Sequence, residues 1–311
     1  MRQPLSAPMI GALCAFGASA SFTLNDMSVK SLSGGYPLHE VILIRSLVAL
    51  AVLLAVIVPL SGGFAQLRTR QPVKHLIRGG FVVFSNICFF VALAAMPIAD
   101  ATAIFFVSPL VIALFSVLFL GETVGPRRWL AIGAGLAGVV VMIRPGSDAF
   151  TPIALLPLLA ATGYAGLQIM TRSLGLGERA VTMAFYIQIT FLFFSMAFGL
   201  VAGSGQWAGH GGGAALDFLL RAWIWPRAAD LPFFLFAGLG TAMGGLLISQ
   251  AYRLCEAALV APLEYVAMPM AIFWGLVVFG EWPDAIAWIG IALILGAGIY
   301  MIWRETRNST R

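Results

Sequence analysis

Charged side chains are scarce in this sequence. Asp, Glu, Lys and Arg make up only 10% of the 311 residues, whereas apolar residues make up 60%. Typical soluble domains contain about 25% charged and about 45–50% apolar residues. A soluble fold with so few charges would expose large apolar patches to water. The composition therefore excludes an ordinary soluble domain and predicts that lipid surrounds most of the folded surface.

Cysteine and histidine are equally sparse, with three of each. The cysteines lie in or beside apolar runs and are interpreted as packing residues: Cys14, Cys88 and Cys255. The histidines lie in separate loops or at the ends of apolar runs: His39, His75 and His210. No spacing suits a metal, and no glycine motif continues into the Lys-Ser or Lys-Thr of a phosphate-binding loop. We expect no metal and no cofactor. A membrane enzyme acting on lipid-linked substrates is the weaker alternative, because it would need clustered His, Asp or Glu.

Ten apolar runs, separated by Pro, Gly and charged residues, fill most of the chain. A transmembrane helix needs about 20 residues, and continuous hydrophobicity predicts helices rather than barrel strands. We predict an all-α integral membrane protein with ten transmembrane helices. The first run also resembles a signal peptide ending at Ala18-Ser19-Ala20, but it continues past that point and is interpreted as a span. The predicted spans are 8–30, 38–60, 74–96, 98–120, 127–144, 151–172, 180–203, 230–252, 257–280 and 284–303.

The net charge of +5 is distributed unevenly between the two sides of these spans. Thirteen Lys and Arg, Arg78 among them, fall on the side of the N-terminus, while four fall on the other side and Arg45 lies within a span. Such an excess marks the cytoplasmic side of a membrane protein. The prediction is a multi-pass protein of the inner (plasma) membrane, with both termini cytoplasmic and no nucleic-acid partner.

The longest predicted loop, 204–229, falls on the outer side. Its second part is apolar and carries Trp223 and Trp225 beside Asp217 and Arg221. This pattern predicts a short helix in the membrane interface, with tryptophan at the level of the headgroups. A gating role for the loop is the alternative.

An internal repeat divides the chain. The segment 92–99 aligns with 251–258, and the same offset places Gly121-Glu122 on Gly280-Glu281. Each Gly-Glu pair is followed by a proline and, seven residues later, a glycine. We predict two five-helix halves, 1–148 and 149–311. Because five is odd, the second half would enter the membrane from the opposite side, as an inverted repeat.

These features resemble a known family. The two five-helix halves, together with Leu120-Gly121-Glu122, Phe279-Gly280-Glu281 and Arg144-Pro145, resemble the EamA type of the drug/metabolite transporter superfamily. The unequal gaps between Gly-Glu and Pro, and the long outer loop, depart from the pattern. The resemblance implies a secondary transporter that exports amino acids, aromatic or neutral ones first, or related small metabolites by alternating access. Alternatives of the same fold are a drug or other-metabolite exporter and a passive facilitator.

Few ionisable residues lie within the predicted spans, where a charge is costly. Glu264 lies deep in the ninth span, and we interpret it as a group that binds a substrate cation or carries a coupling proton. Arg45 could hold a substrate carboxylate or pair with Asp26. Asp26 and Lys30 are four residues apart and predict a pair on one helix face. Asp100 predicts a cap at the start of the fourth span, and Glu122 and Glu281 are interpreted as turn residues.

Uncharged polar and aromatic residues complete the candidate substrate path, since such pockets combine apolar walls with a few polar groups. The candidate substrate-binding residues are Asn86, Tyr164, Gln168, Glu264, Arg45, Asn25, Ser85, Tyr186, Gln250 and Trp274. The candidate hinges are Pro97, Pro109, Pro262 and Pro269. The expected partners are a small-molecule substrate, the lipid bilayer and, where transport is coupled, protons. The assembly is expected to be a monomer or homodimer.

Overall fold

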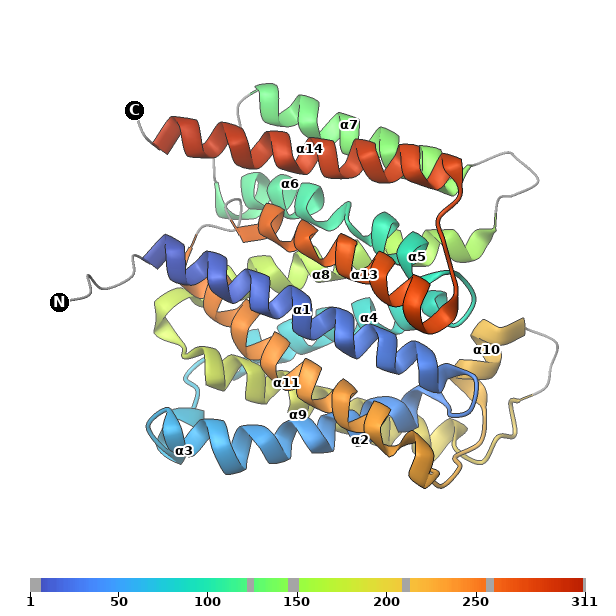
Figure 1. Cartoon of the computed structure of the whole chain (residues 1–311). Helices are drawn as coiled ribbons and strands as arrows, with labels where there is room; N and C mark the ends of the chain where they lie inside the picture. The colour runs from blue at the N-terminus through green and yellow to red at the C-terminus, as the bar shows by residue number, and fades with distance from the viewer. Residues whose placement is uncertain (1–6, 122–125, 145–150, 209–212, 256–259, 310–311) are drawn as a thin grey trace.

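The computed structural model describes residues 7–121, 126–144, 151–208, 213–255 and 260–309, and every regular element within them is helical (Figure 1). Each of the ten predicted spans contains helix, so the all-helical prediction is confirmed. The elements are α1 (Ala7–Ser33), α2 (Leu38–Val52), η1 (Leu53–Ile57), α3 (Val58–Leu60), η2 (Phe64–Leu67), α4 (Pro72–Leu93), α5 (Ile98–Phe105), α6 (Ser108–Leu120), α7 (Pro126–Ile143), η3 (Pro152–Leu155), α8 (Leu156–Leu174), η4 (Gly175–Gly177), α9 (Ala180–Ala202), α10 (Gly213–Leu220), η5 (Ala228–Asp230), α11 (Leu231–Leu254), η6 (Ala261–Val266), α13 (Ala267–Trp274), η7 (Gly275–Phe279) and α14 (Ala285–Ser309).

Six helical stretches among the described residues are long and apolar enough to cross a bilayer. They are Leu38–Leu60, Pro72–Leu93, Ile98–Leu120, Pro152–Leu174, Ala180–Ala202 and Ala228–Leu254. Three shorter apolar stretches accompany them: Gly133–Ile143, Leu263–Phe279 and Ala285–Ala297. Large apolar side chains such as Leu60 and Leu200 remain exposed on the outside of the bundle, as expected where lipid is the solvent. The chain is a multi-pass membrane protein.

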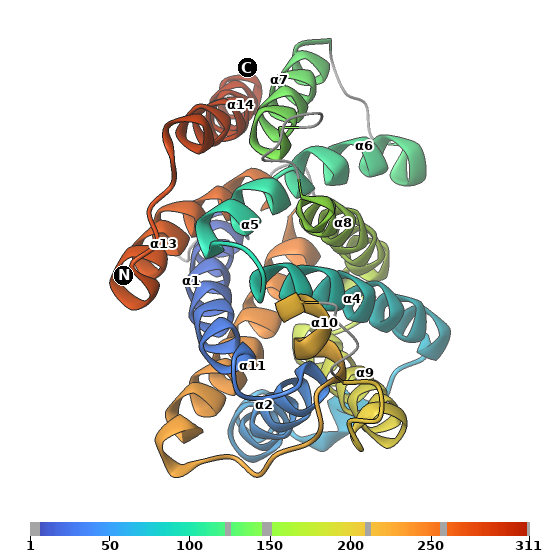
Figure 2. The ribbon, with the colours of Figure 1, turned by 90° about the vertical axis from the view of Figure 1, so that its right-hand side faces the viewer.

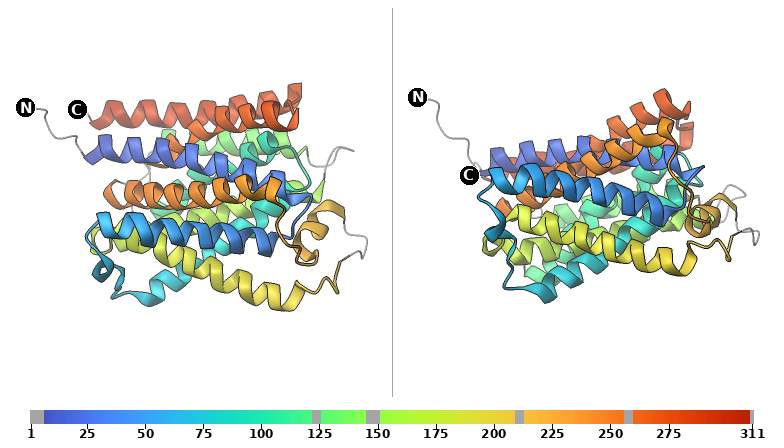
Figure 3. Two further views of the ribbon diagram at one scale, coloured as in Figure 1. Left: turned by 60° about the horizontal axis from the view of Figure 1, so that its bottom comes forward. Right: turned by 90° about the horizontal axis from the view of Figure 1, so that it is seen from below.

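The helices pack side by side along one common direction (Figure 3). α1 packs along α11, α4 along α8, α2 along α9, and α7 along α14. Viewed from one end, α4, α8, α11 and α1 surround the centre of the bundle, and α7 and α14 lie together at its edge (Figure 2). The first turn of α1 and the last turn of α14 lie at the same end, and α10 lies at the opposite end (Figure 1).

Prolines and glycines interrupt the fourth and ninth spans. α5 ends before Phe106, and Pro109 lies in the first turn of α6, where its missing N–H removes no helical bond. The ninth span changes from 3-10 helix to α-helix to π-helix, with Pro269 inside α13. Both spans end on a glycine in the left-handed region: φ is 69° at Gly121 and 66° at Gly280. Only glycine adopts this conformation without a steric penalty, which explains why glycine precedes each Glu.

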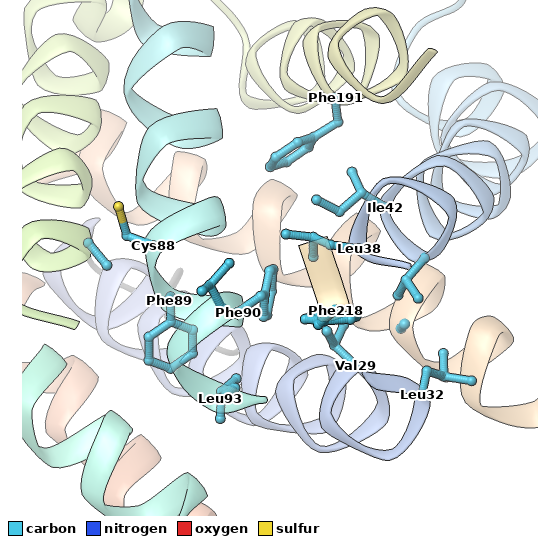
Figure 4. Packing of buried hydrophobic residues seen from close by; sticks show 14 of the residues in the cluster. Val29, Leu32, Leu38, Ile42, Cys88, Phe89, Phe90, Leu93, Phe191 and Phe218 are labelled. Atoms are coloured by element: carbon cyan, nitrogen blue, oxygen red, sulfur yellow. The ribbon is translucent and has the colours of Figure 1, made fainter. Parts of the chain in front are cut away.

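The long loop predicted at 204–229 is bound to the helix bundle through its described residues. Phe218 of α10 is fully buried in the largest core cluster, together with Leu38, Ile42 and Phe90 (Figure 4). The backbone N–H of Ile224 donates to Glu40 Oε2 at 3.0 Å. Trp225, 84% exposed, fits the predicted interfacial tryptophan. The short helix is thus confirmed, but its apolar face packs on protein because α1, α2 and α4 leave a hydrophobic surface there.

Candidate functional site

A cavity lies in the middle of the bundle. Its walls come from α1, α2, α4 and α5 of the first half of the chain, and from α8, α9, α11, η6 and α13 of the second half. Aromatic rings dominate the walls, with amides, hydroxyls and four ionisable side chains between them. The rings are those of Phe22, Phe89, Phe90, Phe105, Phe106, Phe191 and Tyr164. Aromatic walls with a few fixed polar groups are typical of a pocket for a small organic molecule.

Most of the predicted site residues line this cavity. The seven that do so are Asn25, Arg45, Ser85, Asn86, Tyr164, Gln168 and Glu264. The structure brings them together from four different α-helices and the 3-10 segment η6, although they are distant in sequence. As substrate contacts they stay predictions.

Three predicted residues lie elsewhere. Tyr186 donates to the carbonyl of Leu67 and stacks on His75 with ring centroids 4.5 Å apart. Gln250 lines a shallow groove beside Arg253, and Trp274 packs against the main core cluster. Tyr186 and Trp274 lie outside the lining of the central cavity because they face neighbouring helices, and Gln250 because it faces the groove.

Glu264 projects into the cavity from η6 and is held by two phenols. Tyr164 Oη donates to its Oε2 and Tyr252 Oη to its Oε1, each at 2.5 Å. The carboxyl is buried and forms no ion pair with any described residue. Neutral donors from α8 and α11 therefore hold an acidic group without cancelling its charge. Tyr252 was missed from the sequence, where a tyrosine at the end of an apolar span gives no separate signal.

Arg45, on α2, is held by side chains of three other helices, α1, α4 and α9. Its Nη1 donates to Asn25 Oδ1 at 2.9 Å and its Nη2 to Asn86 Oδ1 at 2.8 Å. The guanidinium also lies between the rings of Phe90 and Phe191, 4.9 Å from each centroid, a favourable cation–π geometry. The alternative in which Arg45 pairs directly with a carboxylate is not what the structure has: Asp26 accepts from Asn25 Nδ2 instead. Asn25 therefore lies between Arg45 and Asp26 and forms a hydrogen bond with each of them.

Arg78 is a further cavity residue. It lies within the predicted span 74–96 but was counted with the cations on the side of the N-terminus and was not named as a site residue. That count was wrong for Arg78, because it lies in the second turn of α4 and is only 2% exposed. Its Nε donates to Thr171 Oγ1 at 2.7 Å, its Nη1 to the carbonyl of Met183 at 2.9 Å and its Nη2 to Ser249 Oγ at 3.1 Å. The sequence did contain a signal for this position: Arg78 lies seven residues before the candidate residue Ser85 and therefore on the same helix face.

Two ion pairs lie at the α10 end of the bundle. Lys30 Nζ lies 2.8 Å from Glu281 Oε1 and also donates to the carbonyl of Met96 at 2.8 Å. Glu281 Oε2 accepts the backbone N–H of Ile98 at 3.1 Å. The predicted Asp26–Lys30 pair is wrong, because Lys30 points away from the cavity toward Glu281. Glu281 is therefore more than a turn residue; its counterpart Glu122 lies outside the described residues.

Two more predictions concern this end of the bundle. Asp100 does not cap α5: the N-cap is Pro97, without a side-chain hydrogen bond. Arg144 Nη2 contacts both carboxylate oxygens of Asp284 at 2.6 Å, and Asp284 Oδ1 also accepts the N–H of Ala287 at 2.7 Å. Asp284 thus joins α7 to the first turn of α14. The hydrogen bond from Arg144 holds the pKa of Asp284 below its usual value.

Comparisons with known proteins identify the family. Residues 9–144 match the EamA-like transporter family, and a riboflavin transporter of Rhizobium johnstonii is 32% identical over 80% of this chain and 76% of its own length. The chain belongs to the EamA-like transporter family. The prediction that it is a drug/metabolite transporter, and not an enzyme, is confirmed by this membership.

Other relatives of this EamA-like chain differ in what they are named for. An S-adenosylmethionine uptake transporter of Rickettsia bellii is 26% identical over 94% of this chain and 92% of its own. A pseudopaline exporter of Pseudomonas aeruginosa is 30% identical over 93% of this chain and 94% of its own. A solved structure without a functional name matches the fold with a TM-score of 0.68, at 21% identity over 98% of this chain and all of that chain. These names cover several substrates and both directions, and none of them concerns an amino acid.

Proposed function

We propose that this chain is a secondary carrier of the inner membrane that moves a small ring-bearing metabolite through the central cavity by alternating access. The observation that carries the proposal is the cavity itself, whose aromatic and polar walls come from both halves of the chain. Such walls can stack on a flat ring and hydrogen-bond its substituents. Riboflavin and S-adenosylmethionine, the compounds for which relatives are named, both carry a flat heteroaromatic ring.

The packing of the helices supports two inverted five-helix repeats, 1–148 and 149–311. α1 packs along α11, and the corresponding helices of the other half, α8 and α4, pack along each other; α2 packs on its counterpart α9 and α7 on α14. A two-fold relation between the halves predicts this set of contacts. The matching left-handed glycines at the ends of α6 and η7 add to it. Rocking of one bundle against another would then expose the cavity to each side in turn.

The position of the helix ends supports the proposed topology. α1 begins and α14 ends at one end of the bundle (Figure 1), so the termini share a side, and the excess of Lys and Arg assigns that side to the cytoplasm. A reporter that is active only in the cytoplasm, fused to the C-terminus, should be active. Export is the direction that the family resemblance implies, while relatives are named for uptake as well as export.

Amino-acid export is the second candidate. The cavity holds Arg45, Arg78, Asp26 and Glu264, and groups of both signs suit a molecule with an ammonium and a carboxylate. Glu264 is the group we propose for binding a substrate cation or a coupling proton, because no described basic side chain neutralises it. Pro97, Pro109, Pro262 and Pro269 are the proposed hinges.

The test is counterflow in proteoliposomes with a panel of riboflavin, S-adenosylmethionine, phenylalanine and tryptophan. Unlabelled compound inside the vesicles should accelerate entry of the same labelled compound, because a carrier returns faster when loaded. A passive channel would show no such acceleration. Runs with and without a pH gradient measure proton coupling. If no member of the panel moves, the proposed substrate range is wrong.

A further inference from the structure

We propose that Arg78 forms an anion-binding site in the cavity, which takes a carboxylate or phosphate group carried by the transported molecule. This inference rests on the proposed function and narrows its substrate class to anion-bearing metabolites. It assigns a ligand to a side chain that is not among the candidate site residues of the sequence analysis.

The first observation is burial without a counter-ion. Arg78 is 2% exposed and lines the cavity, and no carboxylate of the described residues forms an ion pair with it. All three of its hydrogen-bond acceptors are neutral: two hydroxyls and one backbone carbonyl. A buried guanidinium is costly unless an anion compensates it. The protein holds the cation in place and leaves its charge for another molecule.

The second observation is unused donor capacity. A guanidinium carries five N–H groups, and Thr171, Met183 and Ser249 accept three of them. Two N–H groups remain. The three acceptors come from α8, α9 and α11 and fix the plane of the group from three sides. A fixed guanidinium with free N–H groups is suited to two-pronged contact with carboxylate or phosphate oxygens.

The third observation is that both carboxylates of the cavity are held by other groups. Glu264 is held by Tyr164 and Tyr252, and Asp26 accepts from Asn25. Neither carboxylate reaches Arg78. Gln168 lines the same cavity less than one turn from Thr171 on α8, and it adds a neutral amide to this part of the wall.

The experiment compares pairs of compounds that differ only in the anionic group. Riboflavin is paired with riboflavin 5′-phosphate, and S-adenosylmethionine with its decarboxylated form, each bound to purified protein in nanodiscs. The first pair reports on a phosphate and the second on a carboxylate. We expect the anionic member of at least one pair to bind tenfold or more tightly to the unaltered protein, and Arg78→Gln to bring the two members of that pair to equal affinity. Arg78→Lys should keep part of the preference.

Arg172→Gln is the matched control. Arg172 follows Thr171 directly but is absent from the cavity lining, so this variant should keep the full preference. If Arg78 only fastens α4 to its neighbours, Arg78→Gln would weaken both members of a pair alike, and the proposal would be overturned. Equal binding of both members of both pairs by the unaltered protein would also overturn it, even if Arg78→Gln does not fold. That result would leave the carrier function standing, whereas failure of all four compounds to bind would reject the proposed substrate range as well.

Discussion

Two ion pairs lie at the α10 end of the bundle, whereas the charged side chains of the cavity are held by neutral groups. At the α10 end, Lys30 pairs with Glu281 and Arg144 with Asp284. In the cavity, Arg45, Arg78 and Glu264 are held by amides, hydroxyls, phenols and rings, and no described ion pair neutralises them. Paired charges join helices, while separately held charges stay available for a ligand. The comparison distinguishes charged groups that join helices from those that we propose to take part in transport.

The largest effect is expected at Glu264. Glu264→Gln keeps the size of the side chain but removes the charge that Tyr164 and Tyr252 hold. A hydrogen bond to a charged group is worth about 1.5–3 kcal/mol, so counterflow should fall by roughly ten- to a hundredfold. The control is Glu178→Gln, a change of the same kind in a carboxylate that accepts from Thr69 outside the cavity. An equal loss of counterflow in both variants would contradict the proposed difference between carboxylates inside and outside the cavity.

A smaller effect is expected at the Lys30–Glu281 pair. Glu281→Gln should weaken the contact between α1, the α4–α5 turn and the start of α14, because Lys30 then faces a neutral amide. Partly buried pairs exceed the roughly 0–1 kcal/mol of surface pairs, so transport should change by several-fold rather than be lost. The measurement is initial counterflow rate.

Charge reversal sharpens this prediction. Lys30→Glu and Glu281→Lys should each impair transport, and the double variant should recover most of it, since opposite charges face each other again. If the double variant is no better than either single one, the pair does not act as a unit.

The smallest effect is expected at Asp284, whose side chain is 58% exposed. Asp284→Asn should lower stability by less than about 1 kcal/mol, the usual range for a surface pair. Because the folded pKa of Asp284 is depressed, its contribution is present above the unfolded pKa and is lost as pH falls through the folded pKa. Thermal unfolding followed from pH 7 to pH 3 should show the difference between Asp284→Asn and the unaltered protein shrinking. A difference that grows at low pH would contradict the assignment.

Helix content and the family could be predicted from the sequence because both rest on local patterns. Apolar runs of about 20 residues locate helices, and Gly121 and Gly280 each mark a helix end whose φ only glycine tolerates. Seven of the ten candidate residues reached the cavity for a similar reason: in a chain this apolar, a polar side chain within a span needs a polar surrounding.

The contacts of those residues could not be predicted from local sequence patterns, because their partners lie far away in the chain. Lys30 pairs with Glu281 across 251 positions rather than with Asp26 one turn away, because rotation of α1 aims Lys30 out of the cavity. Arg78 was counted with the cations of one membrane side because it lies near the start of its span, where the sequence alone does not show whether a side chain faces the cavity or the surface. Tyr186, Gln250 and Trp274 are of the same residue types as those that line the cavity. They differ only in the direction in which their side chains leave the helix.

The setting of Arg45 restricts how the molecule can move. One guanidinium contacts Asn25 of α1, Asn86 and Phe90 of α4, and Phe191 of α9, while belonging itself to α2. A motion that parted any of these four helices would break a charged hydrogen bond or uncover a cation in an apolar interior. A bend at Phe106, where α5 already ends, would break none of these contacts. We therefore expect the four helices around Arg45 to move as one block, and the segments on the far side of Phe106 to move relative to it.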